Sequence, residues 1–317
     1  CAVSLKAGYG NNLNLIFTGN VTKAVTTQEG ADRRTEIEVV DSRVEIRLGA
    51  FPEEELPHLD LVVLSPGVPT DLPVVNRMHE MGIPVWGEIE LAWVCGKGDV
   101  LGITGTNGKT TTTTLLGEII KNAFPSAFVV GNIGMPYTES ALDTREDSVT
   151  VAELSSFQLE SIHTFRPKVS AILNITPDHL NRHHTMEAYI GAKLNITKNQ
   201  TAEDVCVLNY EDETTRKMAE KVNARVLFFA SGHKLEQGIY LEDDAIIYKP
   251  GKDREGILVC RTGELQLLGV HNYENVMAAV AMAAAYGVDM EIIRSTVKAF
   301  RGVEHRIEFV AEKNGVA

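Results

Sequence analysis

The chain has few cysteines, no excess of basic residues and no long apolar run. Its four cysteines, Cys1, Cys95, Cys206 and Cys260, include no CxxC pair, which favours free thiols in a reducing compartment over disulfides or a zinc site. Acidic residues number 43 against 30 basic ones, for a net charge of -13. This balance argues against sequence-independent binding to nucleic acid or to an anionic membrane.

The most apolar stretch, residues 276–288, is too short to span a bilayer and is typical of an alanine-rich core helix. No signal peptide is visible. We therefore expect a cytoplasmic protein with no membrane or nucleic-acid partner, and we also expect a monomer. The chain starts at Cys1 and stops at Ala317, and we treat it as a possible fragment.

At 317 residues the chain is long enough for two domains. Residues 1–35 have no clear hydrophobic period and support no functional prediction. Beyond them, strands alternate with helices, so we expect an α/β fold: a Rossmann-like parallel-sheet domain over residues 1–96 and a P-loop ATPase-like domain with a mainly parallel sheet over residues 97–302. Buried strands are predicted at residues 100–104, 149–154, 169–175, 205–208 and 226–229. Residues 238–268 predict antiparallel edge strands, and residues 272–286 and 290–300 predict helices.

The strongest chemical signal is GITGTNGKTTTTT at residues 102–114, where a strand, a glycine-rich turn and a helix follow one another. In a phosphate loop the backbone N–H groups face the phosphates, Lys109 neutralises the β/γ oxygens and Thr110 binds Mg²⁺. The common GxxxxGK[ST] spacing would need glycine at Ile103, so only the shorter GxxGKT from Gly105 is present. A plain tight turn is the alternative. The predicted ATP-binding residues are Gly105, Thr106, Asn107, Gly108, Lys109, Thr110 and Thr111.

Three further residues stand where they could serve this loop. Glu153 ends a predicted buried strand, where a carboxylate can anchor the nucleotide's magnesium, although a solvated strand-end acid is the alternative. Lys193 falls on the buried stripe of a helix capped by Thr185, or else extends its stem to place the ammonium in solvent. His179 follows the predicted strand at residues 169–175, and from the residues alone a structural loop histidine is the favoured interpretation, because histidine is an uncommon ligand for magnesium. We expect its neighbours His183 and His184 to be solvated.

The chain resembles the Mur ligase family and its relative, folylpolyglutamate synthetase. Besides the loop, the shared segments are GNIG at 131–134, ELSSFQLE at 153–160, TPDHLNRH at 176–183, AKLNI at 192–196, HNYEN at 271–275 and HRIE at 305–308. ELSSFQLE, together with SPGVP at 65–69, is similar to the D-glutamate-adding member in particular. The resemblance covers about residues 40–317.

The resemblance implies roles for individual residues. One magnesium would be held by Thr110 and Glu153, and a second by His179 and a carbamylated Lys193. The expected catalytic residues are Lys109, Glu153, His179 and Lys193. Asn272 and Asn275, on one helical face, would contact the adenine side of ATP, with a helix N-cap and a solvated polar residue as the alternative. Arg306 would lie near the ATP phosphates. The expected substrate-binding residues are Ser65, Pro66, Gly67, Asn132, Ser155, Gln158 and His179. An ordinary Pro-Gly turn is the alternative for the first three.

The resemblance also implies a reaction. We expect an ATP-dependent ligase that adds D-glutamate to UDP-N-acetylmuramoyl-L-alanine through an acyl phosphate during peptidoglycan synthesis. Residues 1–96 would bind the UDP substrate, and residues 303–317 would begin a largely absent amino-acid-binding domain. Residues 1–317 alone should therefore bind ligands weakly and not complete ligation. The alternatives are another amide ligase of the family or folylpolyglutamate type, and a non-catalytic nucleotide-binding module.

Overall fold

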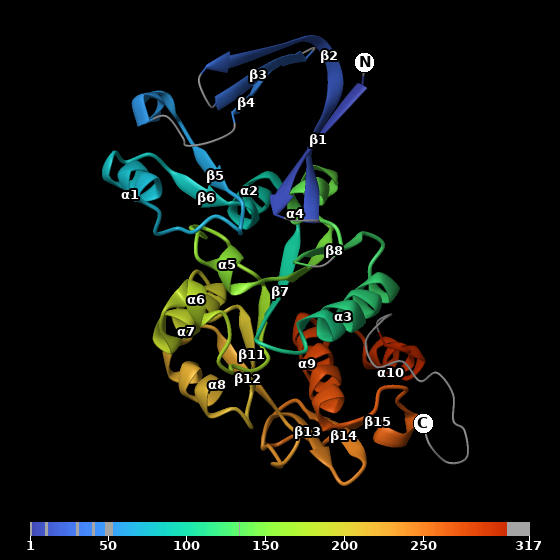
Figure 1. Ribbon diagram of the computed structural model, residues 1–317. Helices are drawn as coiled ribbons and strands as arrows, with labels where there is room; N and C mark the ends of the chain where they lie inside the picture. The colour runs from blue at the N-terminus through green and yellow to red at the C-terminus, as the bar shows by residue number, and fades with distance from the viewer. Residues whose placement is uncertain are drawn as a thin grey trace, which may run out of the picture. The chain divides into compact units, whose positions relative to one another are not determined.

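The computed structural model describes residues 53–132 and 134–302 with their side chains, and the backbone of four strands within residues 1–52 (Figure 1). The chain divides into two compact units, Cys1–Glu88 and Ile89–Ala317. Among the described residues, no helix combines the length and the apolar character that crossing a bilayer would require.

The first unit contains two small sheets. Strands β1 (Ala2–Tyr9), β2 (Asn12–Glu29), β3 (Asp32–Val39) and β4 (Ser42–Arg47) pair antiparallel in chain order. Only two residues separate each strand from the next, and a parallel pairing would need a crossover of a dozen or more. The predicted parallel sheet is therefore wrong for these strands.

The predicted alternation is confirmed in the rest of this unit. Strand β5 (Val62–Leu64) pairs parallel with β6 (Val85–Gly87), and helix α1 (Pro73–Glu80) connects them. A short 3-10 helix, η1 (Glu53–His58), precedes β5. The small core of this part consists of Leu56, Val75, Met78, Ile83 and Val85. Helix α2 (Glu88–Cys95) follows β6.

The second unit is built on a nine-stranded sheet with the order β15-β14-β13-β12-β11-β10-β7-β9-β8. The seven strands β7 to β13 are parallel, and β14 and β15 add an antiparallel edge. This confirms the predicted mainly parallel sheet and its antiparallel edge, whereas β8 was not predicted. The strands are β7 (Asp99–Thr104), β8 (Ala127–Gly131), β9 (Val149–Glu153), β10 (Val169–Ile172), β11 (Val205–Asn209), β12 (Arg225–Ala230), β13 (Gly238–Glu242), β14 (Ala245–Lys249) and β15 (Ile257–Arg261).

Helices cover both faces of this sheet. One apolar core joins the sheet to α3 (Lys109–Ala123), α9 (Val270–Tyr286) and α10 (Met290–Ala299), and α3 and α9 pack side by side (Figure 1). A second core joins the opposite face to α2, α4 (Tyr137–Ser140), α5 (Ser156–Leu159), α7 (Met186–Leu194) and α8 (Glu213–Met218). The remaining short helices are α6 (Leu180–His183), η2 (Ala141–Asp143), η3 (Asn195–Thr197), η4 (Ala219–Lys221) and η5 (Thr262–Glu264).

Parallel pairing brings the carboxyl ends of seven strands to one edge of the sheet. Because ligands of parallel α/β sheets bind at this edge, the residues that follow these strands are the candidates for a site. They include the loop after β7, Asn132 after β8, Glu153 at the end of β9 and Asn174 after β10.

Candidate active site

The loop from Gly105 to Gly108 connects β7 to the first turn of α3, as the sequence predicts for a phosphate loop. Both glycines have positive φ angles, 148° and 83°. A Cβ atom at Gly108 would lie 2.1 Å from Oδ1 of Asn275, so a larger residue there would have to displace the Asn275 side chain as well as adopt a positive φ. The first-turn N–H groups of a long helix then face the space beyond the loop, where an anion is stabilised. Thr110 and Thr111 belong to that turn and are buried.

Asn174, which the sequence did not single out, holds this loop in place. Its Oδ1 accepts a hydrogen bond from the backbone N–H of Asn107 at 2.8 Å, and its Nδ2 donates to the Asn107 carbonyl at 3.1 Å. The backbone N–H of Thr106 donates to the Asn174 carbonyl at 2.9 Å. The Thr106 hydroxyl lies 3.0 Å from that of Tyr189 on α7. The loop is therefore fixed by β10 and α7 as well as by its own turn.

A cavity of about 320 Å³ opens in front of the loop, and it brings Lys109, Thr110, Asn132 and Glu153 together. The Glu153 side chain is only 1% exposed. Its Oε1 accepts a hydrogen bond from Asn132 Nδ2 at 3.1 Å, and the backbone N–H of Asn132 donates to the Glu153 carbonyl at 2.8 Å. Asn132 thus orients the carboxylate, a role that its sequence position alone did not predict.

The second carboxylate oxygen of Glu153 has no hydrogen-bond partner among the described residues, although it is buried. A buried carboxylate oxygen without a donor is costly unless a cation or a water meets it. Thr110 lines the same cavity, and hydroxyl and carboxylate oxygens are the ligand types that magnesium prefers. The residues present therefore fit a magnesium ion between Thr110 and Glu153.

Two lysines converge on a single carbonyl behind the loop. Lys109 Nζ donates to the Gly105 carbonyl at 3.0 Å, and Lys193 Nζ donates to the same oxygen at 2.7 Å. Lys193 is only 2% exposed, so the alternative in which its ammonium reaches solvent is wrong. Burial, and after it the positive charge of Lys109, lowers the pKa of Lys193 from 10.5 to about 7. A substantial fraction of this amine is therefore neutral near pH 7.

His179 is not among the residues that line this cavity. It precedes α6 with a positive φ of 51°, and its half-exposed side chain is 3.5 Å from Asp178. Its ring packs against Phe157, with the centroids 5.0 Å apart. In the described part of the chain, no group of three or more His, Cys, Asp or Glu side chains is arranged to hold a metal ion.

His183 is buried, so the expectation that it is solvated is wrong, whereas His184 is exposed as expected. The His183 ring packs against Tyr189 and Phe157, with centroid separations of 5.3 and 5.5 Å. Its Nε2 lies 2.9 Å from the Ser156 hydroxyl, and burial is the main cause that lowers its pKa. His183 therefore ties α6 to α5.

Ser155 and Gln158 form a capping box at the start of α5. The Gln158 backbone N–H donates to the Ser155 hydroxyl at 3.3 Å, and the Ser155 N–H donates to Gln158 Oε1 at 2.9 Å. In the first unit, Ser65, Pro66 and Gly67 form the turn after β5, closed by the bond from Val68 N–H to the Ser65 carbonyl. The predicted Arg306 lies outside the described residues.

Asn275 and Asn272 lie on α9 beside the phosphate loop. Asn275 is buried and lines a second, smaller cavity of about 70 Å³ with Asn107 and Gly108. Asn272 donates to the Leu268 carbonyl at 2.8 Å. The helix is preceded by Gly269 as its N-cap, so the alternative of a capping asparagine with a solvated partner is wrong.

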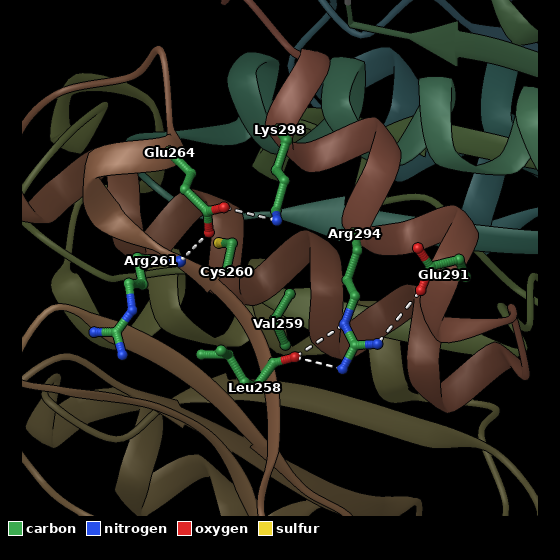
Figure 2. Close-up of a pocket in the computed structure, with 8 residues that line it drawn as sticks. All are labelled: Leu258, Val259, Cys260, Arg261, Glu264, Glu291, Arg294 and Lys298. Atoms are coloured by element: carbon green, nitrogen blue, oxygen red, sulfur yellow. Dashed lines mark hydrogen bonds and ion pairs between the residues drawn. The ribbon is translucent and has the colours of Figure 1, made fainter.

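A third cavity, of about 370 Å³, lies at the far edge of the second unit between β15 and α10 (Figure 2). Figure 2 shows that its charged groups contact one another: Lys298 Nζ lies 2.7 Å from Glu264, and Arg294 donates to the Leu258 carbonyl and approaches Glu291. These charges satisfy each other within the wall of the cavity.

Comparison with known proteins identifies two matching family models. Residues 103–283 match the Mur ligase middle domain, and residues 19–87 match the MurD-like N-terminal domain of Mur ligases. The UDP-N-acetylmuramoylalanine--D-glutamate ligase of Lachnoclostridium phytofermentans is 58% identical over 277 residues, which are 87% of this chain and 61% of that protein. The ligase of the same name from Alkaliphilus metalliredigens is 45% identical over 318 residues, which are 96% of this chain and 70% of that protein. The chain thus spans roughly three fifths of the Lachnoclostridium relative.

Solved structures share the fold at lower identity. A UDP-N-acetylmuramoyl-L-alanyl-D-glutamate--2,6-diaminopimelate ligase aligns with a TM-score of 0.57 at 20% identity, over 80% of this chain and 62% of the other. The UDP-N-acetylmuramate:L-alanyl-gamma-D-glutamyl-meso-diaminopimelate ligase of Neisseria meningitides aligns with a TM-score of 0.56 at 19% identity, over 81% of this chain and 84% of that one.

Proposed function

The chain belongs to the Mur ligase family, and from this premise we propose that it serves the ATP-dependent addition of D-glutamate to UDP-N-acetylmuramoyl-L-alanine in peptidoglycan synthesis. One observation carries the proposal: the cavity in front of the phosphate loop unites Lys109, Thr110 and a buried carboxylate, Glu153, with an unsatisfied oxygen. Such a cavity suits a triphosphate with its divalent cation.

Amide formation from a free carboxylate requires activation, because oxygen is a poor leaving group from a carboxylate. A substrate carboxylate oxygen attacks the γ-phosphorus of ATP, the bond to ADP breaks and an acyl phosphate forms. The amine of D-glutamate then attacks the acyl carbon, and phosphate leaves. Lys109 and the loop N–H groups stabilise the negative charge that gathers when the anions meet. No protein nucleophile takes part.

Magnesium, when bound, would supply further positive charge at the transferring phosphoryl group. We assign Thr110 and Glu153 to one ion, on the fit described above. For a second ion we propose His179 and Lys193. The pKa of Lys193, about 7 because of burial first and Lys109 second, leaves an amine that can react with CO₂, and the carbamate that forms is an anionic ligand. This supports carbamylation of Lys193.

The proposed substrate has a UDP part and a muramoyl part. We propose that residues 1–96 bind its UDP part, with Ser65, Pro66 and Gly67 at the turn after β5, and that residues 97–302 bind ATP. Asn132, Ser155 and Gln158 would contact the muramoyl part. Arg306 would approach the ATP phosphates, and residues 303–317 would begin the part that binds D-glutamate.

The ATP assignment is tested by calorimetric titration of residues 1–317 with Mg-ATP. Lys109→Ala removes the cation of the loop, so we expect binding to weaken at least about tenfold, since charged hydrogen bonds contribute about 1.5–3 kcal/mol. Lys121→Ala, on the exposed last turn of the same helix, is the matched control and should bind as the unaltered chain does. Equal affinities in all three proteins would remove the phosphate loop from the proposal.

The substrate assignment needs the full-length protein. We expect phosphate release to depend on D-glutamate and on UDP-N-acetylmuramoyl-L-alanine, and L-alanine, a diamino acid or a dipeptide not to replace D-glutamate. Titration with UDP-N-acetylmuramoyl-L-alanine against its dipeptide-extended analogue gives a second measure. Preference for the extended analogue would instead indicate a different ligase of the family.

A further inference from the structure

Glu274 places a carboxylate in the wall of the small cavity on α9, next to the phosphate loop. The cavity is lined on one side by Asn107 and Gly108 of the loop and on another by Glu274 and Asn275. Leu173 and Phe229, both almost fully buried, add apolar surface. The cavity thus joins an apolar wall to a fixed negative charge.

The carboxylate is held from two strand ends. Its Oε1 accepts a hydrogen bond from the hydroxyl of Ser231, directly after β12, at 2.6 Å. Its Oε2 lies 3.4 Å from Nδ2 of Asn209, the last residue of β11. Asn209 is in turn fixed, because its Oδ1 accepts a hydrogen bond from the Glu211 N–H at 2.9 Å. Two ionised oxygens offer about four acceptor positions, so these two donors leave acceptor capacity for a ligand.

The location of the cavity indicates which part of a nucleotide meets this carboxylate. Asn107 and Gly108 line both this cavity and the larger one that contains Lys109, so the two cavities adjoin at the phosphate loop. A carboxylate repels phosphate, so the phosphates belong on the Lys109 side. The group joined directly to the phosphates is the sugar, and a ribose carries adjacent hydroxyls that donate hydrogen bonds to a carboxylate.

We propose that Glu274 is a specificity-determining residue that accepts hydrogen bonds from the ribose hydroxyls of the nucleotide and so selects ribonucleotides over deoxyribonucleotides. The inference rests on the proposed ATP site. Asn209 and Ser231 are positioning residues that fix the carboxylate.

The test compares the affinities of residues 1–317 for Mg-ATP, for 2′-deoxy-ATP and for the triphosphate of purine riboside, which lacks the 6-amino group. The unaltered chain should bind ATP about tenfold more tightly than 2′-deoxy-ATP, because a hydrogen bond to a charged acceptor is lost. Glu274→Ala should bind the two within about twofold. Ser231→Ala and Glu274→Gln, which leave the cavity filled, should give a preference of about threefold.

One control variant and two further outcomes separate the possible failures. Glu291→Ala on α10, whose carboxylate is exposed, should keep the full preference for ATP. If the unaltered chain binds no nucleotide, the proposed ATP site itself is wrong and this inference goes with it. If ATP binds but all variants keep the ribose preference, or if Glu274→Ala loses only the preference for the 6-amino group, the ATP site stands and the ribose assignment is overturned.

Discussion

Two cavities of similar volume, about 320 and 370 Å³, lie in the second unit and differ in how their charges are satisfied. At the edge cavity between β15 and α10, Lys298, Glu264 and Arg294 find partners within the wall. At the loop cavity, one oxygen of Glu153 has no partner among the described residues, and the amino groups of two lysines share the Gly105 carbonyl.

Cavity size therefore does not identify the site in this protein. Where the charges in a cavity wall already pair with one another, a bound ligand gains little electrostatic free energy, because it would have to replace contacts already made. A wall with an unsatisfied acceptor and crowded cations is stabilised when a ligand supplies the missing partners. Substitutions in both cavities can test this difference.

The largest difference is expected for glutamate-to-glutamine exchanges. Glu153→Gln keeps the acceptor for Asn132 but removes the charge that faces the cavity, and we expect phosphate release by the full-length protein to fall about 1,000-fold. Glu264→Gln in the edge cavity should change it by less than about twofold. Comparable losses of phosphate release in Glu153→Gln and Glu264→Gln would contradict the conclusion that only the loop cavity binds a ligand.

Lys193 gives the next largest effect, as a dependence of stability on pH. The folded-state pKa of about 7 lies below the ordinary 10.5, so the folded protein binds fewer protons than the unfolded chain between these values. The wild-type protein therefore gains stability as the pH rises above 7, while below pH 7 the cost of the buried ammonium is full. Lys193→Met has no such cost.

The stability advantage of Lys193→Met over the wild type should thus be largest below pH 7 and decrease by about 3 kcal/mol over the next two pH units or so. Urea unfolding at a series of pH values measures it. Lys298→Met, at a partly exposed ion pair in the edge cavity, should show a flat difference. If this stability difference did not change with pH for Lys193→Met, the conclusion that the Lys193 ammonium is buried would be wrong.

Glu90 on α2 sharpens the comparison, because this buried carboxylate is fully satisfied. It accepts hydrogen bonds from the backbone N–H groups of His163, Thr164 and Phe165 and from the Thr164 hydroxyl. Burial alone would raise the pKa of Glu90, but these bonds outweigh it and hold the pKa below 4.5. Glu90→Gln replaces an acceptor by a donor, so we expect a loss of about 2 kcal/mol at pH 7.

The loss for Glu90→Gln should be constant above the ordinary pKa of 4.5 and should shrink as the pH falls through the lower folded-state value, where the native carboxylate is protonated too. Chemical unfolding at pH 7 and in acid tests this. Glu118→Gln on the exposed side of α3 should change the free energy of unfolding by less than about 0.5 kcal/mol. If the loss of stability in Glu90→Gln grew in acid, the conclusion that hydrogen bonds lower the pKa of Glu90 would be wrong.

The smallest effect is expected at the ion pair of the edge cavity. Lys298→Ala breaks the contact with Glu264 between two partly exposed side chains, which should alter the free energy of unfolding by less than about 1 kcal/mol. Mg-ATP affinity should not change. A clear loss of ATP affinity would show that the edge cavity takes part in binding.

The sequence predicted the parts of the fold that depend on local pattern. The apolar runs of β7, β9 and β10 and the stripe of α3 are strong because they are buried on the sheet or against it. Strand β8 is short and half-buried, so its pattern is weak. Strands β1 and β2 were not predicted because residues 1–35 lack a clear period.

Within the site, the sequence predicted the residues of the motifs but not the residues that hold the motifs in place. The loop, Glu153 and the burial of Lys193 follow from position along a strand or helix. Asn174 and Tyr189 contact the loop from 67 and 83 residues away, and such pairings leave no local signal. A polar asparagine near the end of the apolar strand predicted at residues 169–175 is the one hint that points to Asn174. His183 was misjudged because its cover comes from two other elements, α5 and α7.

The reciprocal amide pair between Asn107 and Asn174 means that the loop has its shape before a nucleotide arrives. Fixing the backbone of a mobile residue costs about 1–2 kcal/mol in conformational entropy. A loop that had to become ordered around each incoming phosphate would lose that amount at every position. In this protein the loop is already ordered by folding, so no further conformational entropy of the loop is lost when phosphate binds, and the affinity for phosphate is higher.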